Sequence, residues 1–265
     1  MRILCIGDIV GQPGRKSLAL LLKDLIARHQ ADFVIANAEN AAGGFGLTPK
    51  ICTELFSLGV DVLTTGNHVW RNKEILKVID KEPRLLRPLN FPEGVPGRGS
   101  GVFEKNGHTV GVVNLMGRVF MEAIDCPFKA AKQAADGFRE QGVSICVMDF
   151  HAEATSEKVA MGHYVDGNYS LVFGTHTHVQ TADARLLAAG TAYITDVGMT
   201  GPTDSVIGVL KERAISKFVS GMPSRFDLAD GGVEINGCVC SIDADTGRGL
   251  SIEAFSEKVT LHESK

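Results

Sequence analysis

Long apolar runs and a large excess of one charge sign are both missing from this sequence of 265 residues. The most apolar stretch, residues 17–27, is interrupted by Lys23 and Asp24, so we expect no transmembrane helix and no membrane partner. The apolar run before Asp8 is too short for the hydrophobic region of a signal peptide. The formal net charge of −4 argues against a basic face that would bind duplex nucleic acid.

Cysteine is scarce, and its six positions contain no CxxC pair. Cys238 and Cys240 form the one close pair, and the alternation of a strand would place both side chains on one face. Ordinary packing is favoured for this pair over a zinc or redox role. We therefore expect reduced thiols and a cytoplasmic protein.

Internal repeats, low-complexity tracts and long linkers are missing too, which predicts a single domain over residues 1–265. In the first seventy residues, apolar runs alternate with helical patterns, and this order predicts parallel strands covered by helices. The expected strands are 3–7, 32–37 and 60–66. The expected helices are 14–29, a second that begins at Thr48-Pro49 and ends at Gly59, and 72–80.

The pattern changes after residue 83. Asn106-Gly107 predicts the turn of a hairpin over 100–115, and the alternation around 245–249 predicts a second antiparallel pair. Further strands are expected at 144–150, 170–174 and 191–195, and further helices at 127–141, 154–163 and 205–218. Together these elements predict an α/β fold with mixed sheets, in which parallel pairing comes early and antiparallel pairing late.

Five of the predicted strands are followed directly by side chains that can bind metal ions. Ligand sites in open α/β sheets form beyond the carboxyl ends of the strands, so we expect these side chains to meet at one sheet edge. They are Asp8, Glu39, Asn40, Asn67, His68, His151, His176 and His178.

The chemistry of this set favours transition metals. Carboxylates, side-chain amides and imidazoles suit Mn²⁺, Fe or Zn²⁺ better than a thiolate metal or an all-oxygen Mg²⁺ site. The ligands are too many for one tetrahedral ion, but two ions about 3.5–4 Å apart that share a carboxylate would use them all. Such a pair of ions fits the hydrolysis of phosphate esters.

Several of these residues have an ordinary structural interpretation when taken singly. Asp8 could belong to a simple turn, and Asn67-His68 could cap a helix. The sequence Gly-Thr-His-Thr-His is more specific, because His176 and His178 would point the same way on an extended segment. Two such histidines at the end of a strand favour metal binding over core packing.

At these residues the sequence resembles the calcineurin-like metallophosphoesterases and, within them, the bacterial YmdB family. The matching segments are GDIVGQPGR (7–15), NAEN (37–40), GNHVW (66–70), NLMGRVFM (114–121), DFHAEATSEK (149–158), GTHTHVQTAD (174–183) and VGMTGP (197–202). The resemblance implies a four-layer α/β/β/α sandwich of mixed sheets with a dinuclear metal centre between them. Two departures from the wider superfamily are shared with the YmdB branch: the usual Asp-x-His opening lacks its histidine at Val10, and Glu39 replaces the usual bridging aspartate.

The resemblance also implies roles for the individual residues. Two ions, iron or manganese, would be bridged by Glu39 and by a hydroxide that acts as the nucleophile. The first ion would be held by Asp8, Glu39, Asn40 and His178. The second ion would be held by Glu39, Asn67, His151 and His176. His68 resembles the general acid of the family, which protonates the leaving alkoxide.

The activity that the resemblance implies is a phosphoric diester hydrolase acting on cyclic nucleotides, most specifically 2′,3′-cyclic nucleotides. Hydrolysis of 3′,5′-cyclic nucleotides, of other diesters or of phosphomonoesters at the same site remains open. A different alternative is a regulatory binding protein that acts through an RNA-processing partner. We also expect a homo-oligomer.

Four further residues could also serve the site, and three of them have a second interpretation. Arg118 could contact a phosphate or base, or lie on the surface. Glu153 and Asp183 could orient ligand histidines, although Glu153 could instead cap a helix that begins near Thr155. Phe45 could stack on a base, but burial in its glycine-rich turn is the favoured interpretation.

Overall fold

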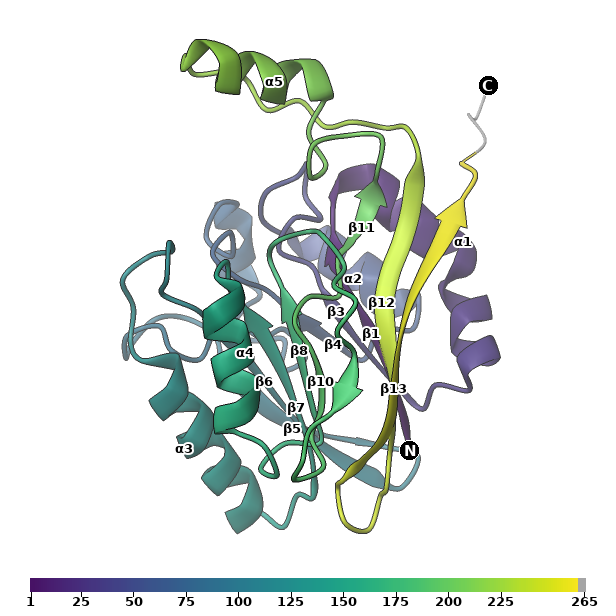
Figure 1. Ribbon diagram of the computed structural model, residues 1–265, viewed down its shortest axis with the longest axis vertical. Coiled ribbons are helices and arrows are strands. Elements are labelled where there is room, and N and C mark those ends of the chain that lie inside the picture. Colours follow the sequence, from purple (N-terminus) through teal and green to yellow (C-terminus); the bar gives the residue numbers. More distant parts are fainter. Residues whose placement is uncertain (262–265) are drawn as a thin grey trace.

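The computed structural model describes residues 1–261, in which two mixed β-sheets pack face to face (Figure 1). The first sheet has the strand order β2-β11-β12-β1-β3-β4, and β13 pairs with β12. Its strands are β1 (Arg2–Ile6), β2 (Asp8–Ile9), β3 (Phe33–Asn37), β4 (Val62–Thr64), β11 (Met199–Pro202), β12 (Val233–Ile242) and β13 (Gly249–Val259). The last four residues of the predicted domain, 262–265, lie outside the described part of the chain.

The second sheet has the strand order β5-β6-β7-β8-β10-β9. Its strands are β5 (Ser100–Lys105), β6 (His108–Met116), β7 (Ile145–His151), β8 (Leu171–Thr175), β9 (Arg185–Leu186) and β10 (Ala192–Ile194). The strands β6, β7, β8 and β10 run parallel to one another, as β1, β3 and β4 do in the first sheet. The two sheets therefore each contain a parallel β-α-β core.

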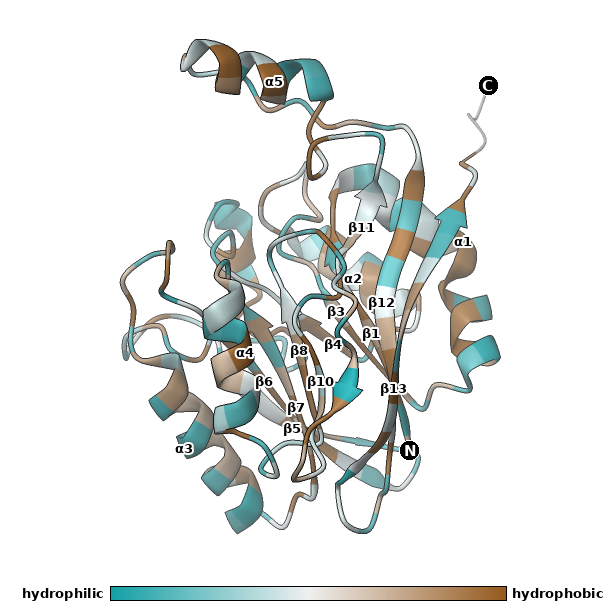
Figure 2. Cartoon of the chain, in the orientation of Figure 1, coloured by the Kyte–Doolittle hydropathy of each residue, from teal (hydrophilic) through white to brown (hydrophobic). Residues whose placement is uncertain are grey.

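Helices cover the outer face of each sheet, which confirms the four-layer α/β/β/α arrangement. Along β1, Ile3 and Cys5 belong to the core between the sheets, whereas Leu4 and Ile6 pack beneath α1 (Gly11–His29) and α2 (Pro49–Ser57). A third apolar cluster joins the second sheet to α3 (Pro127–Glu140) and α4 (Thr155–Tyr164). Strands buried on both faces explain why their sequences are uninterrupted apolar runs, which are brown along the central strands of Figure 2.

Several local predictions are confirmed in detail. Asn106 and Gly107 both have positive φ angles, 52° and 79°, and they join β5 to β6 with Lys105 opposite His108. The Thr48 side chain accepts the backbone N–H of Ile51 at 3.3 Å, and so caps α2 as expected.

Two helix predictions are wrong in extent. Residues 72–80 form only a short 3₁₀ turn, η1 (Lys73–Lys77), because Val78 adopts a φ of −128° that does not continue a helix. The helix expected at 205–218 is α5 (Lys211–Ser220), which begins six residues later. Gly208 has a φ of 98°, in the left-handed region, and Val206 and Val209 pair through their backbones instead. Helix α5 extends away from both sheets, at the top of Figure 1.

The prediction that parallel strand pairing comes early in the chain and antiparallel pairing late is partly wrong. Parallel pairing recurs in the second half of the chain, because the β5–β6 hairpin starts a second sheet with its own crossover helices. The antiparallel pair of β12 and β13 near the end of the chain is confirmed.

The cysteines pack as small apolar side chains. Cys238 and Cys240 are both buried in the core between the sheets, where Cys238 pairs with Cys5 across β12 and β1, and within residues 1–261 all six thiols are free. None of the helices in that same range is long and apolar enough to cross a membrane.

Candidate functional site

All eight predicted site residues lie at the same end of the sandwich, but they come from two sheets rather than one. In the first sheet, Asp8 is part of β2, and the pairs Glu39-Asn40 and Asn67-His68 follow β3 and β4. In the second sheet, His151 ends β7, and His176 and His178 follow β8. The expectation of a single sheet edge is therefore wrong, although the expectation that these side chains meet is correct.

One group of side chains converges on His151. The Nε2 atom of His151 lies 3.1 Å from Glu39 Oε1 and 3.0 Å from both Asn67 Oδ1 and His176 Nδ1. One ligand atom from each of Glu39, His151 and His176 lies within 4.8 Å of the others, a spacing that could hold a metal ion. The four residues expected to bind the second ion therefore lie together around His151 Nε2.

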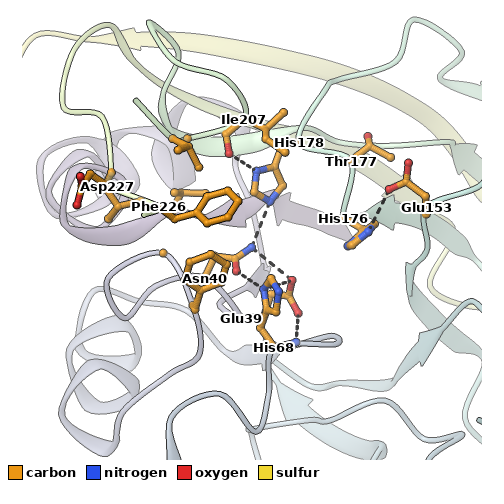
Figure 3. Close-up of a pocket in the computed structure, with 16 residues that line it drawn as sticks. Glu39, Asn40, His68, Glu153, His176, Thr177, His178, Ile207, Phe226 and Asp227 are labelled. Carbon is orange, nitrogen blue, oxygen red and sulfur yellow. Dashed lines mark hydrogen bonds and ion pairs between the residues drawn. The ribbon is translucent and has the colours of Figure 1, made fainter. Parts of the chain in front are cut away.

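A second group gathers around His178. Its Nε2 atom lies 3.1 Å from Asn40 Nδ2 and 3.9 Å from Asp8 Oδ1. Asn40 Nδ2 also donates to Glu39 Oε1 at 3.3 Å. Figure 3 shows His178 and Asn40 pointing toward each other across the pocket, next to Glu39. The four residues expected to bind the first ion are therefore adjacent, and Glu39 belongs to both groups.

The carboxylate of Asp8 indicates what the two groups could bind. Asp8 is fully buried, and its Oδ2 atom accepts the backbone N–H of His176 at 3.1 Å. Among the described residues, its Oδ1 atom has no hydrogen-bond partner. A buried carboxylate oxygen without a partner is costly, and a cation between Asp8, His178 and His151 would satisfy it. With the mixed nitrogen and oxygen donors around it, this orphaned atom fits divalent transition metals.

The carboxylates and imidazoles of the cluster shift one another's pKa values. Burial alone would raise the pKa of Glu39, but the neighbouring imidazoles of His151 and His68 bring it well below its usual value. Burial alone would lower the pKa of His151, but Glu39 and Asp8 outweigh it and raise that pKa to about 9. His176 has a pKa lowered to about 3, by burial first and by the nearby His151 second.

The loop that carries His176 and His178 has an unusual backbone. Their φ angles are 99° and 65°, in the left-handed region that residues other than glycine seldom adopt. The prediction that both point the same way on an extended segment is therefore wrong: His176 faces His151 and Glu153, whereas His178 faces Asn40. Strained backbone of this kind is concentrated at functional sites and needs support from the surrounding structure.

A buried ion pair supplies that support. Lys158 Nζ, on α4, donates to the backbone oxygen of Thr175 at 2.6 Å and to Asp196 Oδ2 at 2.5 Å. The same carboxylate oxygen accepts the backbone N–H of Thr177 at 3.2 Å. Lys158 and Asp196 are both almost fully buried, so this pair holds the backbone on both sides of His176.

His68 is held by two of the predicted ligands instead of capping a helix. Its backbone N–H donates to Glu39 Oε2 at 3.0 Å. Its Nδ1 atom lies 2.7 Å from Asn40 Oδ1, so Nε2 is the ring nitrogen left for a substrate.

Sequence reasoning missed a polar network beneath the site. Asp149 Oδ1 accepts the Thr175 hydroxyl at 2.7 Å, and the same hydroxyl lies 2.9 Å from His151 Nδ1. Asp149 Oδ2 accepts hydrogen bonds from Asn37 and Thr64 of the first sheet. Burial raises the pKa of Asp149 to about 6. The available signal was a polar residue at or near the end of an otherwise apolar strand: Asn37 in β3, Thr64 in β4, Asp149 in β7 and Thr175 in β8.

The structure separates the alternatives for the remaining residues. Glu153 Oε2 lies 3.1 Å from His176 Nε2, and Ala154, not Glu153, occupies the cap position of α4. Asp183 instead accepts hydrogen bonds from Thr181 and Thr195. The Arg118 side chain is exposed.

A cavity of about 370 Å³ opens beside these groups. One wall carries Glu39, Asn40, His68, His176 and His178, and the other is apolar. The main members of the apolar wall are Phe45, Ile207, Val209, Phe226 and Leu228. The interpretation that Phe45 is buried in its turn is therefore wrong. The wall from residues 207–228 was missed because a helix was expected over part of it.

Comparisons with known proteins agree with this geometry. A 2′,3′-cyclic-nucleotide 2′-phosphodiesterase of Bacillus subtilis (strain 168) is 49% identical over 254 residues, which cover 96% of each chain. The crystal structure of a novel phosphatase from Mycoplasma pneumoniae superposes with a TM-score of 0.92 at 37% identity, covering 97% of this chain and 93% of that one. A 5′-nucleotidase precursor from Thermus thermophilus shares the fold alone: its TM-score is 0.55 at 13% identity, over 97% of this chain and 54% of that one.

The family comparison extends along almost the whole chain. The sequence profile of the family described as YmdB-like protein matches residues 4–255, which include all eight site residues. With the donor cluster, the two-sheet fold and these relatives in agreement, the chain belongs to the YmdB-like protein family.

Proposed function

We propose that this chain is a metal-dependent phosphodiesterase that hydrolyses 2′,3′-cyclic nucleotides. The observation that carries the proposal is the meeting of two groups of nitrogen and oxygen donors at Glu39, beside a buried carboxylate oxygen, Asp8 Oδ1, that has no hydrogen-bond partner among residues 1–261. The activity named for the Bacillus subtilis relative, at 49% identity across 96% of the chain, supports this substrate class.

The assignment of ligands follows the two groups of side chains. Asp8, Glu39, Asn40 and His178 would hold one ion. Glu39, Asn67, His151 and His176 would hold the other. When bound, such ions neutralise the phosphate oxygens and lower the pKa of a water that attacks phosphorus. Glu153 and Thr175 would orient His176 and His151 through the hydrogen-bonding contacts described above.

His68 would move the proton that the reaction requires. Its Nδ1–H donates to Asn40 Oδ1, which leaves Nε2 to carry the proton for the leaving oxygen. The bond from phosphorus to the 2′ oxygen breaks, that oxygen takes the proton from His68, and a water oxygen forms the new bond to phosphorus. The product is a nucleoside 3′-monophosphate, and the proton lost by the water balances the proton gained by the 2′ oxygen.

A substrate panel tests the activity. With Mn²⁺ or Fe²⁺ added, we expect turnover of 2′,3′-cyclic AMP and slower or no turnover of 3′,5′-cyclic AMP and of adenosine 3′-monophosphate. Turnover of monoesters with the cyclic nucleotides untouched would move the assignment to a phosphatase, the description given to the Mycoplasma pneumoniae relative.

A variant of His68 tests the proton transfer separately. His68→Gln should lose about 10²–10⁴-fold in kcat on 2′,3′-cyclic AMP, because an alkoxide leaving group needs a proton. The same variant should lose much less on bis(4-nitrophenyl) phosphate, because 4-nitrophenolate leaves without one. An equal loss on both esters would contradict the role of His68 as the acid.

Five finer points also remain proposals. The two metals are iron or manganese, which metal analysis of the purified protein would test by finding two such ions per chain. The chain forms a single domain, lies in the cytoplasm and assembles as a homo-oligomer. The fifth point is an RNA-processing partner. If a Glu39→Gln variant that has lost hydrolysis kept the cellular phenotype, the cellular role would depend on binding such a partner and not on hydrolysis.

A further inference from the structure

We propose that the apolar wall of the cavity is a nucleobase subsite that binds the base by stacking, without reading its hydrogen-bonding edge. This inference rests on the proposed phosphodiesterase function and adds what that function does not contain: where the base lies and how selective the enzyme is for it.

Two half-exposed aromatic rings form the centre of this wall. Phe45 is 40% exposed and Phe226 is 48% exposed, although both lie among apolar neighbours. Their ring centroids are 5.9 Å apart and the rings are nearly perpendicular, at 88°. A planar base that lies flat on one ring would meet the second ring in edge-to-face contact. Figure 3 shows Phe226 pointing into the pocket beside His178.

The apolar wall lies directly next to His68, the proposed proton donor. The Phe45 ring contacts His68 edge-on, with centroids 5.0 Å apart at 81°. With the phosphate at the donor cluster and the leaving oxygen beside His68, the ribose would extend past Phe45. The base would then lie against Phe226, which lines the same cavity next to Phe45. The cavity of about 370 Å³ lies within the usual range for small-molecule sites.

The two rings are placed by segments that pack closely. Gly44 has a φ of 92°, and a Cβ atom added there would lie 2.8 Å from Leu228 Cδ2. Glycine at residue 44 suits both this positive φ and the close packing of the Phe45 turn against Leu228. This close approach brings two rings from distant parts of the chain to one wall.

The polar groups of this wall are already committed to other partners. Asp227 lines the cavity, but its Oδ2 atom lies 3.2 Å from Arg213 Nε and its Oδ1 atom lies 3.1 Å from Arg225 Nε. The Thr177 hydroxyl lies within hydrogen-bond distance of the Val179 backbone. A wall of this kind favours stacking area over base identity, so purines should bind better than pyrimidines and all four bases should be accepted.

The test compares 2′,3′-cyclic AMP with a base-free analogue, methyl β-D-ribofuranoside 2′,3′-cyclic phosphate, in the presence of Mn²⁺. In the wild-type protein, kcat/KM should be about 5–150-fold higher for the nucleotide, because that is the factor one stacked base contributes. Phe226→Ala should remove most of this preference through KM, and Phe226→Trp should keep it.

Phe218→Ala is the matched control. Phe218 is 80% exposed on α5 and, among the described residues, is not one of those that line the cavity. This variant removes the same ring from the same region and should leave both substrates unchanged. Across the four 2′,3′-cyclic nucleotides, kcat/KM should vary by less than about a hundredfold.

The failures of this proposal and of the proposed function are distinguishable. A wild-type protein that hydrolyses both cyclic esters equally well overturns the subsite and leaves the phosphodiesterase intact. An equal loss on both esters in Phe226→Ala also overturns the subsite, because the ring would then serve the fold. A wild-type protein that hydrolyses neither ester overturns the proposed function itself.

Discussion

The two walls of the cavity are held in different ways. The donor wall is built from strand ends, its proposed ligands Asp8, Glu39 and His151 are almost fully buried, and buried polar contacts fix them from below. The apolar wall is built from segments that leave the sheets, and its rings Phe45 and Phe226 stay half-exposed. Chemistry needs ligands in fixed positions before the substrate arrives, whereas a wall that accepts different bases does not. The following predictions test that contrast.

The largest effect is expected from Glu39→Gln, which removes the one charge shared by both groups of donors. Groups that only orient a metal ligand cost about 10–100-fold when they are lost, so turnover of 2′,3′-cyclic AMP should fall by more than about a hundredfold. Metal content, measured by mass spectrometry, should fall as well. Glu54→Gln is the control, because Glu54 forms a partly buried ion pair with Arg15 and belongs to neither group of donors. Full activity in Glu39→Gln would contradict the assignment.

The next effect concerns the support of the histidine loop. Lys158→Met leaves Asp196 buried without its cationic partner, which should lower the free energy of unfolding by about 3–5 kcal/mol. Lys105→Met is the comparison, because the pair of Lys105 with Asp61 is partly exposed and should contribute about 0–1 kcal/mol. Urea unfolding of both variants measures the difference. Equal losses would mean that the donor wall has no special support.

Thr175→Val tests the network beneath the donors. It removes the hydroxyl between His151 and Asp149 and keeps the shape of the side chain. Affinity for Mn²⁺, measured by calorimetric titration, should fall by about 10–100-fold. Thr191→Val is the matched control, since the buried Thr191 hydroxyl donates to the Tyr169 backbone away from the site. The idea fails if both variants bind Mn²⁺ equally well.

The smallest effect is expected from a pH-dependent contact near the second sheet. Burial acts to raise the pKa of Asp183, but hydrogen bonds from Thr195 and Thr181 outweigh it and lower that pKa below its usual value. A lowered pKa in the folded state stabilises the protein above about pH 4, and this contribution is lost as the pH falls through the folded pKa. Asp183→Asn should therefore be less stable than wild type at pH 7.

Unfolding in urea at pH 7, 5 and 3 checks this sign. The gap in stability between wild type and Asp183→Asn should narrow toward pH 3. Asp24→Asn, at an exposed position on α1, should show no such gap. A gap that widens at low pH would reverse the assigned direction.

The strand ends were the part of the site that the sequence predicted well. A buried strand is visible in the sequence as an apolar run, and so is a polar residue at or just after its end, such as Asp8 after β1 or His151 at the end of β7. The division into two sheets was not visible in the same way, because β1 and β7 read alike and nothing local says which strands pair. That part of the fold came from the resemblance to a family.

The polar network beneath the donors and the apolar wall of the cavity could not be predicted from the sequence, because both depend on contacts between distant segments. Asp149 and Thr175 meet only when β7 and β8 pair, so their partnership depends on tertiary structure. The approach of Phe45 to Phe226 depends on the packing of Gly44 against Leu228, residues that are far apart in the chain. Helical spacing in residues 205–218 overrode the breaking effect of Gly208 in the prediction.

The donors are divided between the two sheets, so the site exists only where the two sheets pack together. Neither sheet carries all of the proposed ligands: the first has no imidazole at its strand ends other than His68, and the second lacks Glu39 and the two amides. A slip of one sheet against the other by a single residue would dismantle both sets together. Cations bound there would link the two sheets, so metal binding should stabilise the folded sandwich and metal removal should lower its stability.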